Sequence, residues 1–148
     1  MVLPITQADL SMAPVYAGAL VFTQDGKLLC QLRDDKPHIV APGIWSCCPG
    51  GSVEPGETPH EAIVRELLEE FEVEVTELKS LHTHREYSVE YAGTYHAFQA
   101  QLATPIDDVR CNEGQRVSFY KPEQALELPQ HPVSLTFLKH YLKSGTGL

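Results

Sequence analysis

Three glutamates in one short segment of the chain could act together chemically. Glu66, Glu69 and Glu70 are spaced i, i+3 and i+4, which places their carboxylates on one face of a helix. Like charges this close repel one another and mildly destabilise a helix, whereas a bound divalent cation would reverse that effect. Carboxylate oxygens are the ligands that hard cations such as Mg²⁺ prefer. The spacing alone leaves two interpretations open, a solvated acidic face or a metal site.

The acidic charge of the chain is concentrated around these glutamates. The 148 residues have a formal net charge of −9. Residues 54–77 contain nine glutamates and a single Lys or Arg residue, Arg65, so this segment accounts for nearly all of the excess charge. A nucleic-acid groove needs a basic surface. We therefore expect no polymeric nucleic acid as a partner.

A helix over residues 59–71 must position these carboxylates. Thr58 can act as its N-cap, Pro59 suits the first helical position, and Glu61 completes a T-x-x-E capping box. One arc of this helix is apolar and should pack on a sheet. It comprises Ile63, Val64, Leu67, Leu68 and Phe71.

The loop before the helix brings a further carboxylate to the same place. Gly50 and Gly51 allow backbone conformations that other residues avoid. Residues 52–56 then return the chain, so that Glu57 arrives just before the helix cap. A carboxylate there could form an ion pair with Arg65.

The remaining elements predict a mixed sheet covered by helices on both faces. Strands are expected over residues 15–22, 27–33, 45–48, within 73–91, over 94–102 and 115–120, with a turn at Asp25 and Gly26. Residues 34–44 and 104–114 should be loops, and residues 122–126 a short helix. An amphipathic helix over residues 132–142 should close the chain, burying Val133, Phe137, Leu138 and Leu142.

Taken together, the central residues resemble the Nudix box, the signature of the Nudix hydrolases. The match reads Gly51-x5-Glu57-x7-Arg65-Glu66-Leu67-x-Glu69-Glu70-x-x-Val73. One position departs from the family pattern, because Glu72 stands where the family has Gly. That position lies just past the helix, where a left-handed backbone is common, so Glu72 should cost about 1 kcal/mol or change the helix exit. It lies beyond the carboxylates, so we expect it to affect stability more than metal binding.

The resemblance implies a Nudix-type α/β/α sandwich, with a mixed β-sheet between helices, that hydrolyses a diphosphate bond in nucleoside diphosphate derivatives with Mg²⁺ or Mn²⁺. Carried over position by position, Glu66, Glu69 and Glu70 would be metal ligands. Glu57 would support them or bind a further ion, and Gly50 is assigned to the same metal site. Arg65 would orient the cluster, and we assign Arg65 and Glu69 to the catalytic residues.

Residues outside the box are candidates for the remaining roles. Glu113 follows Asn112 and precedes Gly114 in a loop where many Nudix enzymes place an additional metal ligand or general base. The alternatives are that Glu113 is an ordinary exposed loop acid and that Glu86 or Glu90 is the base.

Substrate contacts are expected from Arg33, Arg85 and Tyr120. Each of the two arginines could contact phosphates or could simply be a surface charge. Tyr120 and Phe119 lie on opposite faces of a strand, so only one of them can line a pocket.

The leading function is hydrolysis of a nucleoside triphosphate, including an oxidised one, to monophosphate and pyrophosphate. A nucleotide sugar or a dinucleoside polyphosphate is the alternative substrate, and a nucleotide sensor without turnover is the alternative of another class. Residues 42–48 also resemble isopentenyl diphosphate isomerase, but the carboxylate box favours a hydrolase.

The length of 148 residues is that of one ordinary domain. With the resemblance, we expect a single Nudix hydrolase domain over residues 1–148, as a monomer or homodimer. The first 14 residues carry no secretory signature, and no apolar run is long enough to span a bilayer. Four cysteines without a regular spacing should be free thiols. We therefore expect a cytoplasmic protein with no membrane partner.

Overall fold

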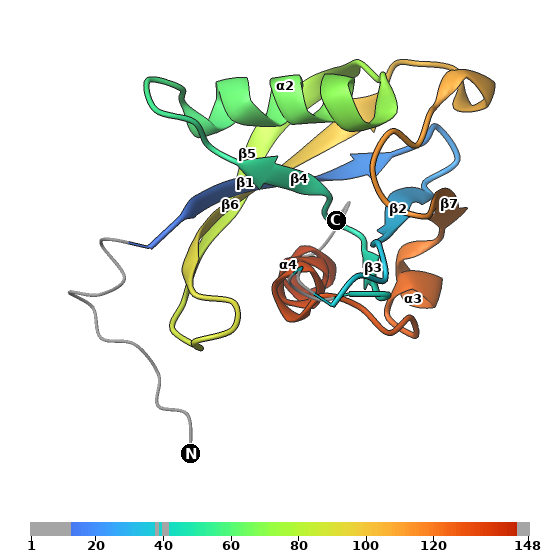
Figure 1. Ribbon diagram of the computed structural model, residues 1–148. Helices are drawn as coiled ribbons and strands as arrows, with labels where there is room; N and C mark the ends of the chain where they lie inside the picture. The colour runs from blue at the N-terminus through green and yellow to red at the C-terminus, as the bar shows by residue number, and fades with distance from the viewer. Residues whose placement is uncertain (1–12, 38, 40–41, 145–148) are drawn as a thin grey trace.

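A mixed sheet lies between two helices in the computed structural model, which describes residues 13–37, 39 and 42–144 (Figure 1). Most of the N-terminal segment for which no secretory signal is predicted lies outside the described residues. The strands are β1 (Val15–Phe22), β2 (Leu28–Leu32), β3 (Trp45–Ser46), β4 (Gly50–Ser52), β5 (Val75–Glu86), β6 (Gly93–Leu102) and β7 (Arg116–Tyr120). The helices are α2 (Pro59–Phe71), α3 (Pro122–Ala125), α4 (Pro132–Lys143) and the 3₁₀ turn η1 (Ile106–Asp108).

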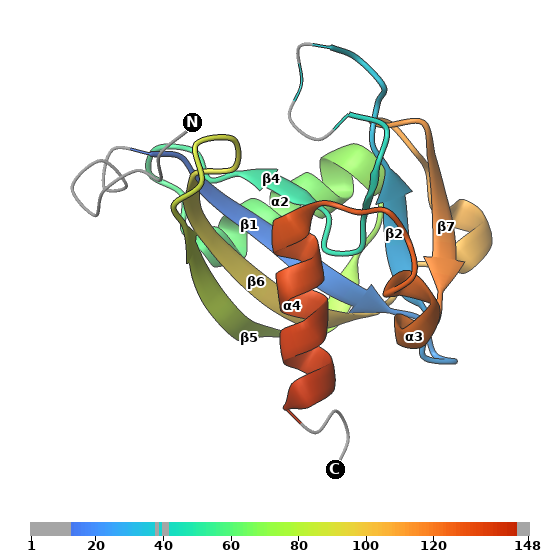
Figure 2. The same cartoon turned by 90° about the horizontal axis from the view of Figure 1, so that it is seen from below.

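The strand order is β3-β2-β1-β6-β5, with β4 paired to β1 and β7 paired to β2. β1 and β6 run parallel, whereas the other pairs are antiparallel. α2 covers one face of the sheet, and α4 crosses the other face in front of β1, β6 and β5 (Figure 2). The predicted α/β sandwich is therefore confirmed.

Each helix closes its own apolar core, and β1 contributes to both cores because its side chains alternate between the two faces. The core under α2 contains Ala17, Ala19, Val21, Leu29, Ala62, Ile63, Leu67, Phe71, Val73, Phe98 and Leu102. The core under α4 contains Leu20, Leu28, Cys30, Trp45, Cys47, Cys48, Ala97, Ala125, Val133, Phe137 and Leu138. Three of the four predicted buried residues of α4 are in this second core, and Leu142 is partly buried against it.

The predicted apolar arc of α2 is wrong at two positions. Val64 and Leu68 are 46% and 54% exposed. Ala62 and Glu70, which were not part of the predicted arc, are buried together with Ile63 and Leu67 instead. α2 thus turns part of its carboxylate face, rather than its whole apolar arc, toward the sheet.

Smaller differences concern the ends of the strands. The observed strands are shorter than expected for residues 27–33 and 45–48, β5 lies within residues 73–91 as expected, and the loop over 104–114 contains η1. β4 is an additional strand that the sequence did not predict, because its two glycines indicate a loop. β4 exists because Tyr16, Ala17 and Gly18 of β1 pair with it.

Candidate active site

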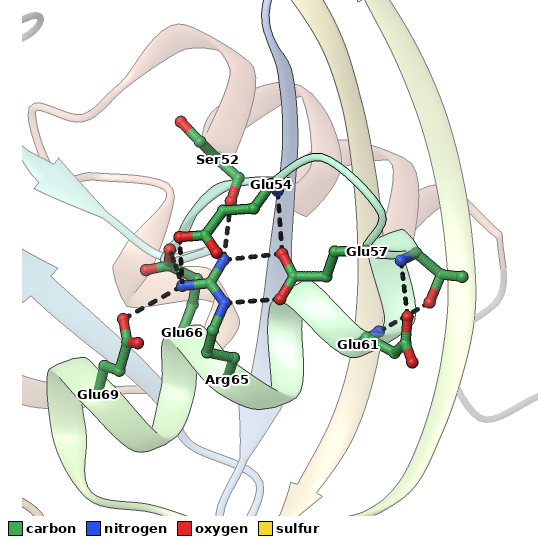
Figure 3. Close-up of polar contacts among 8 residues, drawn as sticks. Ser52, Glu54, Glu57, Glu61, Arg65, Glu66 and Glu69 are labelled. Atoms are coloured by element: carbon green, nitrogen blue, oxygen red, sulfur yellow. Dashed lines mark hydrogen bonds and ion pairs between the residues drawn. The ribbon is translucent and has the colours of Figure 1, made fainter.

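The start of α2 is fixed by the predicted capping box. The hydroxyl of Thr58 accepts from the backbone N–H of Glu61 at 3.1 Å, and the Glu61 carboxylate accepts from the backbone N–H of Thr58 at 2.9 Å (Figure 3). Both contacts satisfy N–H groups that have no partner within the helix. The first turn of α2, which leads into Arg65 and Glu66, is therefore well defined.

Arg65 ties the loop and the helix together (Figure 3). Its Nε and Nη2 donate to the two carboxylate oxygens of Glu57 at 2.6 and 2.9 Å. Its Nη1 donates to Glu66 at 2.9 Å and to Glu69 at 3.2 Å, and Nη2 also donates to the Ser52 carbonyl at 3.0 Å. One guanidinium group thus sets the positions of three of the predicted site carboxylates.

This network has a clear electrostatic effect on Glu57. Hydrogen bonds from Arg65, and one from the backbone N–H of Glu54 at 3.0 Å, lower the pKa of Glu57 to about 2. The hydrogen bonds to Glu57 and Glu66 raise the pKa of Arg65. Glu57 is therefore ionised, and its carboxylate closes the loop between β4 and α2.

Glu70 lies in a different environment from Glu69. Glu70 is only 5% exposed, whereas the Glu69 side chain is 59% exposed and turns toward Arg65. Gln31 Nε2 lies 3.4 Å from Oε1 of Glu70, but among the described residues no donor reaches its Oε2. Burial, followed by contact with Glu66 and the charge of Glu113, raises the pKa of Glu70 to about 9. Without a bound cation, the buried carboxyl group of Glu70 therefore keeps its proton at neutral pH.

The two glycines before α2 are required by close approach. A Cβ on Gly51 would lie 2.5 Å from the carboxyl carbon of Glu66, and a Cβ on Gly50 would overlap the carbonyl oxygen of Ala17. Neither glycine has a positive φ angle, so the predicted reason, an unusual backbone conformation, is wrong. Their missing side chains let β4 lie between β1 and the carboxylate of Glu66.

The donor set suits a divalent cation, although its members do not meet at one point. In the part of the chain that the structure describes, no three His, Cys, Asp or Glu side chains are arranged so that they could hold a metal ion. However, Oε2 of Glu70 is buried without a partner in the described part of the chain, the Glu70 side chain interacts with that of Glu66, and both side chains offer hard oxygen ligands. These groups fit a cation such as Mg²⁺.

Glu113 lies beside Glu70, and Gln31 connects the two. The Nε2 of Gln31 donates to the backbone carbonyl of Glu113 at 2.8 Å as well as approaching Glu70. Gly114 has a φ of 93°, and a Cβ there would lie 2.8 Å from the carbonyl oxygen of Leu32. Gln31 is 4% exposed. The sequence analysis missed Gln31, whose signal is a polar residue in the middle of an apolar strand.

A cavity of about 290 Å³ adjoins this carboxylate cluster. It is lined by Tyr16, Ala17, Gly18, Gln31, Arg33, Ser46, Cys48, Pro49, Gly50, Gly51, Ser52, Glu90, Tyr91, Tyr95, Glu113, His131, Val133, Ser134 and Phe137. The rings of Tyr16 and Tyr95 stack at 4.8 Å between centroids. The cavity therefore extends from the cluster across β1 to α4.

The structure separates the predicted substrate contacts. Arg33 lines the cavity, as does the candidate base Glu113, but Arg85 and Tyr120 do not. Tyr120 packs edge-on against Trp45 with ring centroids 5.5 Å apart, and Arg85 is an exposed residue of β5.

The carboxylates considered as alternative bases also separate. Glu90 lines the cavity, whereas Glu86 does not and lies 2.8 Å from Nε2 of His84.

His131 is a cavity residue that the sequence analysis missed. Its Nδ1 accepts from the backbone N–H of Val133 at 3.2 Å and so caps α4. Burial, and then the charge of Arg33, lower the pKa of His131 to about 4. The ring is therefore neutral at pH 7, and with Nδ1 acting as acceptor the proton is on Nε2. A histidine before the Pro that starts a helix is the only sequence signal for this role.

All four cysteines are free thiols, as predicted. Burial raises the pKa of Cys47 and Cys48, so both stay protonated at neutral pH. The Sγ of Cys47 donates to the side-chain oxygen of Gln130 at 2.9 Å. Of the two, only Cys48 lines the cavity.

Comparison with known proteins identifies the family. The family model described as NUDIX domain matches residues 12–141. The chain belongs to the Nudix family. The CTP pyrophosphohydrolase of Escherichia coli K12 is 29% identical over 125 residues, covering 84% of this chain and 88% of that protein. An uncharacterized Nudix hydrolase of Pseudomonas aeruginosa is 32% identical over 130 residues, covering 83% and 74% of the two chains.

The fold of this Nudix hydrolase agrees with solved structures. The MutT protein of Methanosarcina mazei superposes with a TM-score of 0.76 at 20% identity, covering 90% of this chain and 95% of that one. The predicted membership of the Nudix hydrolases is thus confirmed, and the chain is an enzyme that hydrolyses phosphorus-containing acid anhydrides. Nudix proteins generally use divalent metal ions. Within the described residues, no helix is long and apolar enough to cross a membrane.

Proposed function

We propose that this Nudix hydrolase cleaves a nucleoside triphosphate to its monophosphate and pyrophosphate, with Mg²⁺ or Mn²⁺ as the cation. The observation that carries the proposal is a cavity of about 290 Å³ whose lining includes Gly51, which packs against Glu66, and Gln31, which reaches Glu70. That cavity has aromatic walls and a basic side chain, Arg33, as a nucleotide site requires. The similarity to the CTP pyrophosphohydrolase of Escherichia coli supports a triphosphate substrate.

Glu66, Glu69 and Glu70 would hold the cation, with Glu57 and Gly50 at the edge of the site. When bound, the cation would neutralise charge on the phosphates and lower the pKa of the attacking water. The triphosphate would otherwise be repelled by these carboxylates, which lie in the most acidic segment of the chain.

Arg65 would act on the carboxylates rather than on the substrate. Its guanidinium group already binds Glu57, Glu66 and Glu69, so its donors are directed toward the cluster. Such contacts hold the carboxylate oxygens in place before substrate binds, so these groups need not be reordered during each reaction cycle.

Glu113 would be the general base. Its side chain is exposed and lines the cavity beside Glu70, from an element other than α2. It would accept the proton of a water that attacks a phosphorus atom, while the bond from phosphorus to the pyrophosphate oxygen breaks and pyrophosphate leaves. Arg33, on the same cavity wall, would contribute hydrogen bonds to the phosphates.

The cavity would hold the nucleoside. The ring of Tyr95 and the buried neutral ring of His131 line it, the latter with a proton on Nε2. That N–H can donate to a carbonyl oxygen of a base. The cavity therefore favours a nucleobase that presents a carbonyl oxygen to the Nε2–H group of His131.

The experiment is a panel of nucleotides incubated with Mg²⁺, with the products identified by chromatography. The panel holds the common ribo- and deoxyribonucleoside triphosphates, oxidised triphosphates, a nucleotide sugar and a dinucleoside polyphosphate. We expect a triphosphate to turn over fastest, giving a nucleoside monophosphate and pyrophosphate. Release of inorganic phosphate, or faster turnover of the sugar or dinucleoside compound, would contradict the proposal. Tight binding of nucleotides without any turnover would instead indicate a sensor.

A further inference from the structure

The C-terminal end of α2 is closed by the loop that carries Glu113. The last carbonyl groups of a helix have no partner within it. Here the carbonyl of Glu69 accepts from the side-chain amide of Asn112 at 2.9 Å, and that of Glu70 accepts from the backbone N–H of Asn112 at 2.8 Å. The carbonyl of Phe71 accepts from the backbone N–H of Arg110 at 2.9 Å. Three successive carbonyls are thus satisfied by one segment.

Glu72, the residue that follows α2, makes a further contact with Asn112. The residue ends α2 in the left-handed region, with φ 54° and ψ 40°, and its Oε2 accepts from the side-chain amide of Asn112 at 3.1 Å. A glycine, which the Nudix box has at this position, could not make this contact. Asn112 therefore uses its backbone N–H and its side-chain amide on the end of the same helix.

The next residue along the chain is Glu113. Its backbone carbonyl accepts from Nε2 of Gln31 at 2.8 Å, and the residue lines the cavity. The segment has no regular secondary structure, so without these contacts its peptide groups would sample many conformations. The contacts on both sides of Glu113 limit where its carboxylate can lie.

We propose that Asn112 is a positioning residue that holds the Glu113 carboxylate beside Glu70 by binding the C-terminal end of α2. This inference rests on the proposed function, in which Glu113 accepts a proton. A base whose backbone is fixed is in place more of the time, so Asn112 should act on the rate of the chemical step and not on substrate affinity.

The test compares Asn112→Ala and Asn112→Asp with wild type. Asn112→Asp keeps the size of the side chain and loses its amide donors, so it serves if Asn112→Ala fails to fold. Thr104→Ala is the matched control, because the Thr104 hydroxyl also makes a side-chain to backbone contact just past α2, accepting from the N–H of Glu74 at 2.9 Å, and neither residue belongs to the proposed site. Each variant is measured for kcat and KM and, without substrate, for deuterium uptake in residues 109–114.

We expect both Asn112 variants to lower kcat about 10-fold or more, with KM changed less than about 2-fold, and to speed deuterium uptake. Thr104→Ala should keep the wild-type kcat. Adding Asn112→Ala to Glu113→Gln should lower kcat no further, because Asn112 acts through Glu113. A kcat within about 2-fold of wild type, or effects of the two substitutions that multiply, would overturn the proposal.

The deuterium uptake separates this proposal from the proposed function. If wild type turns over no nucleotide, the proposed function fails. Uptake in residues 109–114 then decides whether Asn112 holds the loop, and unchanged uptake in both Asn112 variants overturns the inference.

Discussion

The carboxyl group of Glu70 is buried where α2, β2 and the loop before β7 meet. Its neighbours are Glu66, Glu113 and the amide of Gln31, so it has one weak donor and two acidic groups around it. Burying a charged carboxylate without a cation or donors is costly, and the group responds by keeping its proton. Binding of a divalent cation at this position should therefore release a proton.

This environment predicts an unusual pH dependence of stability. The pKa of Glu70 is raised from 4.5 to about 9, so between these values the folded protein binds more protons than the unfolded chain. The free energy of unfolding of wild type without divalent cations should therefore fall as the pH rises from about 5 to about 9. Glu70→Gln should remove most of this slope and be more stable than wild type at the alkaline end.

The measurement is urea unfolding across this pH range in excess EDTA. Glu74→Gln is the matched control, because Glu74 is an exposed glutamate three residues past α2 and its replacement removes the same charge. Parallel stability curves for wild type and Glu70→Gln would show that Glu70 is ionised in the folded protein and that its burial has no such effect.

Contacts between individual residues were predictable where the signal is local. The structure brings Glu57, Glu66 and Glu69 onto Arg65, as the resemblance to the Nudix box implies. Gln31, Asn112 and His131 were missed because their partners are distant in sequence. Arg85 and Tyr120 do not line the cavity. The register of the strands decides which side chains reach it, and that register depends on partners that are distant in sequence.

At the scale of single elements, α2 shows which parts of a helix its own sequence determines. Its start matches the prediction because Thr58 and Glu61 complete a capping box between themselves. Its buried face does not match, because an apolar arc does not say how much of it the sheet will cover. Val64 and Leu68 remain exposed while Glu70 is buried.

The end of α2 permits a paired test of backbone strain. Glu72→Gly and Glu72→Ala both remove the contact with Asn112, but only alanine keeps a Cβ at a φ of 54°. A left-handed residue with a Cβ costs roughly 1–2 kcal/mol, and glycine loses somewhat more entropy on folding. We expect the free energy of unfolding of Glu72→Gly to exceed that of Glu72→Ala by about 1 kcal/mol. Equal values, or a less stable glycine variant, would show that the end of α2 relaxes out of this conformation.

At the scale of the whole molecule, glycines allow carboxylates on one face of the sheet to lie near a cavity that reaches the other face. α2 brings the carboxylates on one side, and the cavity reaches α4 on the other. Gly18, Gly50 and Gly51 allow β1, β4 and the segment before β4 to pack without side chains between them. A site on one face can therefore open into a cavity on the other.

The segments of this fold were predictable, but their arrangement was not. Alternating apolar residues and turn residues identified most of the strands and helices near their observed bounds. The parallel pairing of β1 with β6, and the addition of β4 to β1, join segments far apart in the chain and depend on packing. The cavity depends on that arrangement, and its lining could not be derived from the sequence.

The central claim is that the carboxylates of α2 carry a cation-dependent hydrolysis. The most direct measurement is the rate of pyrophosphate release from the preferred triphosphate with Mg²⁺, for wild type, Glu69→Gln and the control Glu74→Gln. We expect Glu69→Gln to lower kcat by about 10²-fold or more while its far-ultraviolet spectrum stays that of wild type, and Glu74→Gln to match wild type. Excess EDTA should abolish the wild-type rate. A wild-type rate from Glu69→Gln, or full activity of wild type in EDTA, would contradict the account.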